Sequence, residues 1–188
     1  MLALILVAFL STAFAARPGF QTSGAVEWRD CSNAADTWIP ISKFGISPNP
    51  VPVPGKTVVE LTSELKHELK NAVDMDVIFE KELLGQFTKV VCVKDVGTCH
   101  YDDPCNFLNV FKGDAGCPKQ LADNGLPCTC PFNPTAINLP PSTFTVTNIN
   151  SAWGFLATGT YHVKITVTEK ATSTVRGCLE AYLAIARN

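Results

Sequence analysis

The sequence predicts an all-β protein whose sheets each have one buried face. Residues 73–80, 161–168 and 179–185 alternate apolar and polar side chains with a period of two. Such alternation is typical of antiparallel strands that pack one face on a core and turn the other to water. Of the 188 residues, 46% are hydrophobic and only 17% are charged, which favours a globular domain over a disordered chain.

The N-terminal segment has the composition of a secretory signal peptide. Residues 1–15 carry no charge and end in Ala13-Phe14-Ala15, a small-x-small cleavage pattern. The apolar run is too short to cross a bilayer, and no second segment is long and apolar enough to do so. We therefore expect residues 1–15 to be a signal peptide and residues 16–188 to form a single domain; a signal anchor is the alternative.

The remaining elements follow in chain order from weaker patterns. The proline-rich run 47–55 predicts an extended edge segment. We expect strands over 56–62, 87–93 and 142–149, and strand ends around a turn in 61–69, whose leucines also fit a helical stripe. Glycine and proline interrupt the stretch 92–130, where we expect a disulfide-tied loop region with a short helix near 106–110.

The cysteines are even in number and follow the predicted signal peptide, which favours four disulfides. Arithmetic alone leaves 105 pairings. Cys92 and Cys99 are close enough in sequence to close a hairpin, whereas Cys31 and Cys178 have no local partner. The alternative is a metal site at Cys128-Thr129-Cys130 with His100, but C-x-C lacks the C-x-x-C spacing of zinc sites, so disulfides are preferred.

Charge and motifs exclude several function classes. The 15 Lys and Arg against 17 Asp and Glu leave no basic excess for nucleic acid. G-x-S-x-G, H-E-x-x-H and phosphate-binding glycine loops are all absent from the sequence. His162 is expected to be solvated on the polar face of its strand, and Asp74 and Asp76 to face water. We predict no catalytic residue, no metal and no cofactor.

Two loops carry bulky apolar residues where small polar ones are usual. Residues 83–87 lie between two expected strands, and residues 152–156 precede the strand at 161–168. Such side chains indicate either contact with a lipid surface or the rim of an apolar pocket. The alternative is that they fold over the core.

Several motifs together resemble one family. The run 125–132, Gly-Leu-Pro-Cys-Thr-Cys-Pro-Phe, together with 77–82 and the spacing of Cys92 to Cys105, resembles the ganglioside-activator members of the MD-2-related lipid-recognition (ML) superfamily. The likeness extends from Trp28 to Cys178, and all eight cysteines have counterparts. It implies a single β-cup of about eight antiparallel strands in two sheets around an apolar lipid cavity. It also implies the pairs Cys31 with Cys178, Cys92 with Cys99, Cys105 with Cys130 and Cys117 with Cys128.

The resemblance further implies a function. Its members are non-enzymatic carriers that extract a ganglioside from a membrane surface and present it to lysosomal beta-hexosaminidase A. The expected partners are thus a glycolipid, this hydrolase and, transiently, a membrane, and the expected location is the lysosome or the extracellular space. Phe87 stands where the family has tryptophan, and the loop at Trp153 is about two residues longer, which leaves the headgroup preference open.

The candidate lipid contacts are inferred from the strand and loop patterns together with the family resemblance. The inner faces of the predicted strands should form the cavity wall, and the apolar loops its rim. The wall candidates are Val73, Met75, Val77, Phe79, Tyr161, Val163, Ile165 and Val167. The rim candidates are Leu83, Leu84, Phe87, Trp153, Phe155 and Leu156.

Two other function classes are alternatives to a glycolipid carrier. A secreted esterase would need an activated nucleophile, which the sequence does not show. A secreted lipid-recognition protein of the same fold, with a different lipid or a receptor as its partner, is the closer alternative. Co-purification with a receptor ectodomain rather than a glycosidase would distinguish it.

Overall fold

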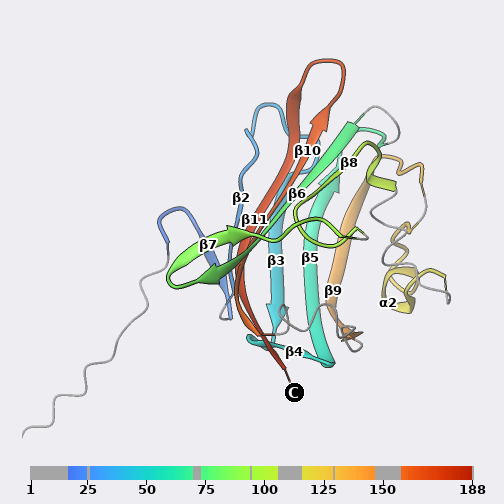
Figure 1. Ribbon diagram of the computed structural model, residues 1–188. Coiled ribbons are helices and arrows are strands. Elements are labelled where there is room, and N and C mark those ends of the chain that lie inside the picture. Colours follow the sequence, from blue (N-terminus) through green and yellow to red (C-terminus); the bar gives the residue numbers. More distant parts are fainter. Residues whose placement is uncertain are drawn as a thin grey trace, which may run out of the picture.

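Two β-sheets face one another and form a cup (Figure 1). The computed structural model describes residues 17–24, 26–69, 73–93, 95–105, 116–128, 130–146 and 158–187. The larger sheet has the order β1 (Gln21–Ser23), β2 (Val26–Asp30), β11 (Thr174–Arg187), β10 (Gly159–Glu169), β6 (Val73–Leu83) and β7 (Gln86–Lys89), with β4 (Val51–Val53) beside β11 and β8 (Cys99–Tyr101) beside β6. The smaller sheet has the order β3 (Ile41–Ser47), β5 (Gly55–Leu65) and β9 (Thr135–Val146).

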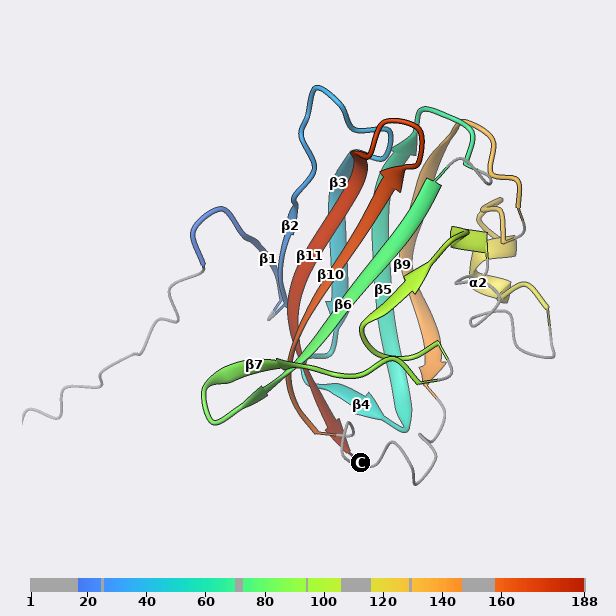
Figure 2. The same cartoon turned by 45° about the horizontal axis from the view of Figure 1, so that its top comes forward.

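The predicted all-β class is confirmed. All named strand pairs are antiparallel except β4 with β11. Figure 2 shows the two sheets crossing the molecule as layers, with the one-turn helix α2 (Lys119–Ala122) beside β9. Among the described residues, no helix has the length and hydropathy needed to cross a membrane.

The alternating segments formed strands as predicted, and the segments with weaker patterns were predicted correctly only in part. β6, β10 and β11 contain the three alternating segments. The strand expected at 56–62 continues to Leu65, and the leucine-rich stretch then turns before Leu69 pairs with Phe132. The proline-rich run is an extended edge segment, since β4 lies beside the end of β11.

Two strand boundaries were wrong. β7 ends at Lys89 rather than at Val93, because the chain folds back in isolated bridges of Val91 with Thr98 and Val93 with Val96. β9 begins at Thr135, before the expected start, and tolerates Pro140 and Pro141 because it is an edge strand of its sheet. Residues 147–149 and the helix expected near 106–110 lie outside the described residues.

Register decides which side chains face the space between the sheets. Across β6 and β10, Phe79 stands opposite Val163, Val77 opposite Ile165, and Met75 opposite Val167. Opposed residues in an antiparallel pair project from the same face, so the apolar side chains of both strands share one side of the sheet.

The core lies on that inner side, in two groups of buried residues. The larger group contains Leu65, Leu69, Val73, Met75, Val77, Cys99, Tyr101, Phe132 and Val167. In the smaller group, Phe79 stacks on Tyr161 at 5.0 Å between ring centroids, with Val90 and Ile185 nearby. Burial raises the pKa of the Tyr161 phenol to about 12, so it stays neutral over the physiological range.

Four disulfides hold the fold. They join Cys31 to Cys178, Cys92 to Cys99, Cys105 to Cys130 and Cys117 to Cys128, the same pairs that the family resemblance implies. No cysteine is free. The alternative of a metal site at Cys128 and Cys130 is therefore wrong, because both sulfurs are bonded to other cysteines.

Candidate functional site

An apolar cavity of about 360 Å³ lies between the sheets, on the side of the molecule that carries α2. Of the described residues that line it, Thr135 is the one with a polar side chain. The cavity is lined by Ile39, Leu61, Leu65, Leu69, Met75, Pro104, Leu121, Leu126, Pro127, Phe132, Thr135, Ile137, Leu139 and Val167. Such a surface can hold hydrocarbon but offers almost no hydrogen bond to a polar ligand.

A second apolar cavity of about 180 Å³ adjoins the first. It reaches Gly177, Cys178 and Leu179 of β11 and has Ser63 as its polar lining side chain. Both cavities share four lining residues: Ile39, Leu61, Ile137 and Val167. We refer to the two cavities together as the lumen.

The predicted wall residues divide into three groups. Met75 and Val167 line the larger cavity, and Ile165 and Val167 line the smaller one. Val73 and Val77 are buried in the core beside the lumen. The remaining three, Phe79, Tyr161 and Val163, lie on the same face of the sheet but line neither cavity.

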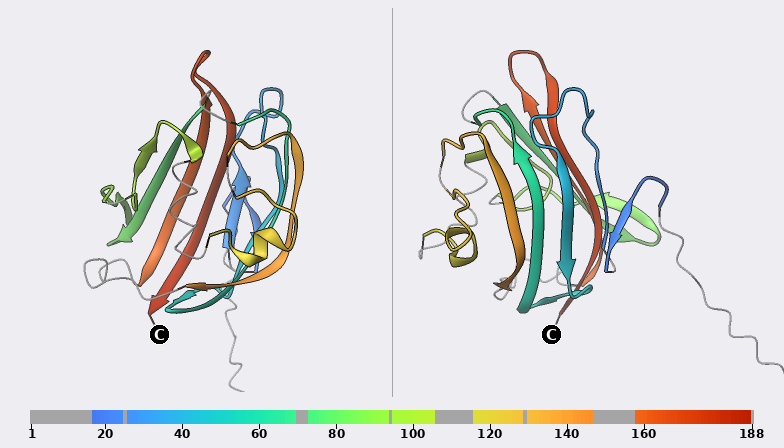
Figure 3. Two further views of the ribbon diagram at one scale, coloured as in Figure 1. Left: turned by 90° about the vertical axis from the view of Figure 1, so that its right-hand side faces the viewer. Right: turned by 180° about the vertical axis from the view of Figure 1, so that it is seen from behind.

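The expected rim residues at 83–87 lie elsewhere. Leu83 and Leu84 are 50% and 105% exposed at the tip of the β6–β7 hairpin. The hairpin and α2 project from opposite sides of the molecule, as Figure 3 shows from behind. Phe87 contacts His162 and Tyr182 edge-on, at 5.9 and 5.4 Å between ring centroids.

The rim assignment of these three residues is thus corrected. His162 faces away from the lumen because it alternates with Tyr161 and Val163, so Phe87 packs on the outer side of the sheet. Trp153, Phe155 and Leu156, the other expected rim residues, lie outside the described residues.

Many lining residues were missed because they lie outside the clearly alternating segments. Leu61, Leu65 and Leu69 belong to the stretch whose period was ambiguous, and Ile137 and Leu139 alternate in β9 ahead of its prolines. Ile39, Leu121 and Leu126 come from loops or from the short helix, where no periodicity marks the side that faces inward. The one available signal was the two-residue spacing of Ile137 and Leu139.

The outer face of the larger sheet carries a polar cluster that spans four strands. His162 Nδ1 lies 2.8 Å from Glu80 Oε2, and its Nε2 lies 2.8 Å from Glu180 Oε1. Arg29 Nε donates to Glu180 Oε2 at 2.8 Å. The expectation that His162 is solvated is wrong, since its side chain is only 12% exposed between these carboxylates.

The ionisation of this cluster follows from its contacts. Burial alone would raise the pKa of the Glu180 carboxyl, but the hydrogen bonds from Arg29 and His162 outweigh burial and hold that pKa below its usual value. Tyr182 covers the cluster. Its ring stacks on the His162 ring with 4.6 Å between ring centroids, and the Arg17 guanidinium lies over it, 3.8 Å from its centre. The group is an internally satisfied ion network.

A second acidic group surrounds His100, which is half exposed. Its Nδ1 lies 2.7 Å from Asp76 and its Nε2 3.3 Å from Asp102, while Lys170 lies 3.3 Å from Asp74. The hydrogen bond to Asp76, opposed only in part by desolvation, raises the pKa of His100. Asp74, His100 and Asp102 come close enough to share an ion, but the ion pairs already explain the arrangement.

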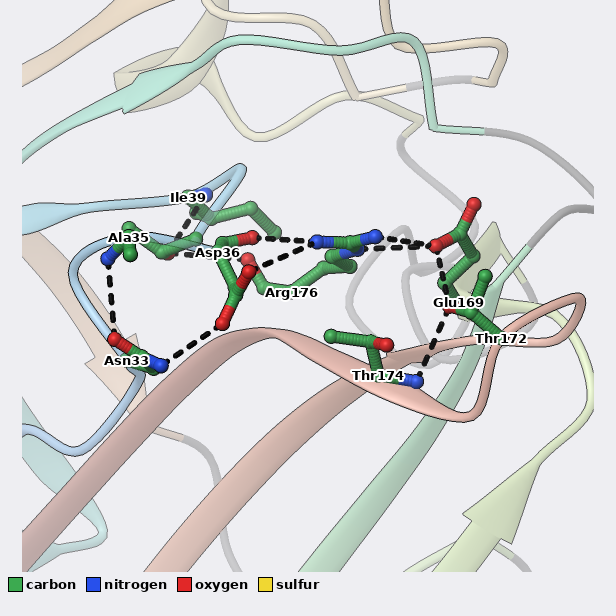
Figure 4. A network of polar contacts seen from close by, with 9 residues as sticks. Asn33, Ala35, Asp36, Ile39, Glu169, Thr172, Thr174 and Arg176 are labelled. Carbon is green, nitrogen blue, oxygen red and sulfur yellow. Dashed lines mark hydrogen bonds and ion pairs between the residues drawn. The ribbon is translucent and has the colours of Figure 1, made fainter.

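Arg176 fixes the start of β11 beside the smaller cavity, which the next residue, Gly177, lines. Its guanidinium lies between Asp36 and Glu169, with Nη2 2.7 Å from Glu169 Oε2 and Nη1 donating to the Asp36 carbonyl at 3.1 Å (Figure 4). It also lies 4.9 Å from the Trp38 ring centre. Hydrogen bonding to Thr172 and then to Arg176 lowers the pKa of Glu169, so the ion pair persists into mildly acidic solution.

Comparison with known proteins identifies a family and two relatives that are similar to this chain. A family model described as the ML domain matches residues 25–185. A mouse protein named ganglioside GM2 activator is 31% identical over 167 residues, which are 87% of this chain and 84% of the relative. The macaque protein of that name is 30% identical over 168 residues, 87% and 86% of the two chains. A crystal structure of the C-terminal domain of wzt aligns with a TM-score of only 0.33 at 11% identity, over 92% of this chain and 82% of that chain.

Proposed function

Because the chain belongs to the ML-domain family, we propose that it is a lipid carrier that extracts a ganglioside or related glycolipid from a membrane and presents it to a lysosomal glycosidase. The family and both relatives support the more general assignment of this chain as a lipid-binding protein. The ganglioside and the role of activator are suggested by the name of those relatives, and the hydrolase and the lysosome are our further proposal.

The observation that carries the proposal is the apolar lumen between the sheets. Each methylene removed from water contributes about 0.8 kcal/mol, so an acyl chain in the lumen loses little relative to the bilayer that it leaves. The nearly complete absence of polar lining groups favours hydrocarbon over a polar ligand. The headgroup would then stay outside, accessible to a soluble enzyme.

In this proposal the partner glycosidase, and not this chain, catalyses hydrolysis of the glycolipid. Among the described residues that line the lumen, there is no histidine, carboxylate or free thiol that could act as base or nucleophile. Of the described histidines, His100 and His162 contact carboxylates on the outer face of the sheet. We therefore propose that the chain acts as an activator that supplies substrate.

The cysteines and the N-terminal segment support the proposed compartment. Four disulfides suit an oxidising compartment, and residues 1–15 are proposed as the signal peptide that brings the chain there. The exposed Leu83 and Leu84 are proposed to touch the membrane surface, at a site separate from the lumen.

A matched pair of variants tests the proposal. Ile137 lines both cavities, while the next residue, Asn138, is exposed on the opposite face of β9. Ile137→Glu should reduce ganglioside transfer between vesicles at least about tenfold, because a carboxylate in the lumen would be desolvated. Asn138→Glu should transfer like the wild type, with both folds checked by circular dichroism.

The same proteins then test the partner. Wild type should stimulate hydrolysis of vesicle-bound ganglioside by beta-hexosaminidase A, and Ile137→Glu should not. Transfer without stimulation would favour a secreted carrier that serves another partner. Equal transfer by Ile137→Glu and Asn138→Glu would contradict the lumen as the lipid site.

A further inference from the structure

The segment 37–40 bridges the two sheets, and we call it the strap. On one side the backbone N–H groups of Trp38 and Ile39 donate to the Arg176 carbonyl of β11, at 2.6 and 3.2 Å. On the other side the Pro40 carbonyl accepts from the Ser63 hydroxyl of β5 at 2.9 Å. The strap therefore joins the two sheets at a fixed place beside the lumen.

Ile39 is the strap residue that enters the lumen. It lines both cavities, at the boundary that they share. The other three shared residues, Leu61, Ile137 and Val167, belong to strands of the sheets themselves. Of the four described residues at this boundary, Ile39 is thus the one that can change without altering a strand.

Gly177 makes room for this side chain. A Cβ built on Gly177 would lie 3.1 Å from Ile39 Cδ1 and 3.2 Å from Ile39 Cβ, closer than ordinary contact. Gly177 has no positive φ, so the turn chemistry that usually requires glycine does not apply here. Its missing side chain is explained by the packing of Ile39 against β11.

We infer that Ile39, seated on Gly177, limits how far an acyl chain reaches from the larger cavity into the smaller one, and so sets the preferred chain length. The inference rests on the proposed function. A rigid strap makes the limit sharp. Arg176 lies over the Trp38 ring of the strap and is itself held by its ion pair with Glu169, which Figure 4 shows. A chain that is too long must leave its excess methylenes in water.

The size of the effect follows from the hydrophobic contribution of one methylene. A methylene left in water rather than buried lowers affinity about fourfold. For chains beyond the limit of the wild type, Ile39→Ala should therefore raise relative binding about fourfold for each methylene newly accommodated. Gly177→Ala should lower the relative binding of those longer chains, because its new Cβ would push Ile39 further into the boundary between the two cavities.

The experiment uses gangliosides that share one headgroup and carry acyl chains from dodecanoyl to tetracosanoyl. The secreted protein is incubated with vesicles of this mixture, and the bound species are quantified by native mass spectrometry. Ile185→Ala is the matched control, since Ile185 is also half-buried but lines neither cavity. Ile39→Val serves if Ile39→Ala does not fold, with a smaller shift in the same direction.

The outcomes separate the inference from the proposed function. A shift to longer chains in Ile39→Ala, with an unchanged profile in Ile185→Ala, supports the inference. Bound ganglioside with the same profile in both variants and in Gly177→Ala would overturn it and leave the proposed function intact. A wild type that binds no ganglioside of any length would overturn the proposed function, and the inference with it.

Discussion

His162 shows how a residue's role depends on strands that are distant in sequence. Its two carboxylate partners, Glu80 and Glu180, lie on β6 and β11, the neighbours of β10 in the sheet. An imidazolium can donate from both ring nitrogens, whereas a neutral ring can donate from only one. The alternating pattern correctly placed His162 on the outer face, but could not show that aromatic rings from β7 and β11 cover it.

The lowered pKa of Glu180 predicts a pH-dependent loss of stability. A carboxyl whose pKa is lower in the folded state stabilises the fold above its unfolded pKa, near 4.5, and loses that contribution as the pH falls through the folded value. Glu180→Gln should therefore lower the free energy of unfolding at neutral pH by about 1–3 kcal/mol, since Arg29 and His162 lose their charged partner. At a pH of about 3 the difference should shrink.

Urea unfolding at both pH values measures this difference. Glu64→Gln is the control, because Glu64 is an exposed carboxylate on β5. It should change the unfolding free energy little at either pH. A loss of stability in Glu180→Gln that is the same at both pH values would contradict the ion-network interpretation.

At the scale of elements, the β6–β7 hairpin combines tight turn geometry with an exposed apolar tip. Leu84 and Gly85 have φ of 53° and 79°, the positive values that a two-residue hairpin turn requires. Leucine is poorly suited to this conformation, and Leu84 is fully exposed. Its presence is therefore better explained by an external contact than by folding.

Leu84→Asn separates the two roles. Asparagine tolerates positive φ, so the melting temperature should stay the same or rise. Vesicle binding, measured by flotation, should fall several-fold if Leu84 touches the membrane. Exposed Gln86→Asn on the same hairpin is the control and should bind vesicles like the wild type. Unchanged flotation of Leu84→Asn would remove the hairpin from the membrane contact.

The sequence predicted elements best where one face of a strand is buried. β6, β10 and β11 alternate strictly and were predicted as strands. The strand predicted at 142–149 begins earlier, at Thr135, because prolines interrupt the pattern of β9. The strap is held by hydrogen bonds to distant strands, and α2 by a disulfide and a hydrogen bond to β9, so their inward residues leave no periodic signal. This is why Met75, Ile165 and Val167 were predicted to line the cavity while Ile39 and Leu126 were not.

At the scale of the whole molecule, the Cys31–Cys178 disulfide joins β2 to β11 across 147 residues of sequence. Cys117–Cys128 closes a loop with a separation of only 11. In the chain-entropy model the longer loop contributes about 5 kcal/mol and the shorter about 3 kcal/mol. The first bridge also lies next to Gly177 and the smaller cavity.

Serine replacement of each pair tests this ordering. Cys31→Ser with Cys178→Ser should lower the free energy of unfolding by about 5 kcal/mol, more than the roughly 3 kcal/mol expected for Cys117→Ser with Cys128→Ser. Denaturant titration of the two double variants measures both values. An equal or reversed loss would show that native-state packing, rather than loop closure, governs the contribution of these bridges.

The central claim is that an acyl chain lies in the lumen between the two sheets, and photo-crosslinking tests it most directly. A ganglioside with a photoreactive group at the end of its acyl chain is bound, irradiated, and the labelled peptides are mapped by mass spectrometry. We predict labels on lumen residues such as Leu61, Ile137 and Val167. Labels confined to the outer face around Tyr182 or to the β6–β7 hairpin, with none on those residues, would contradict the account.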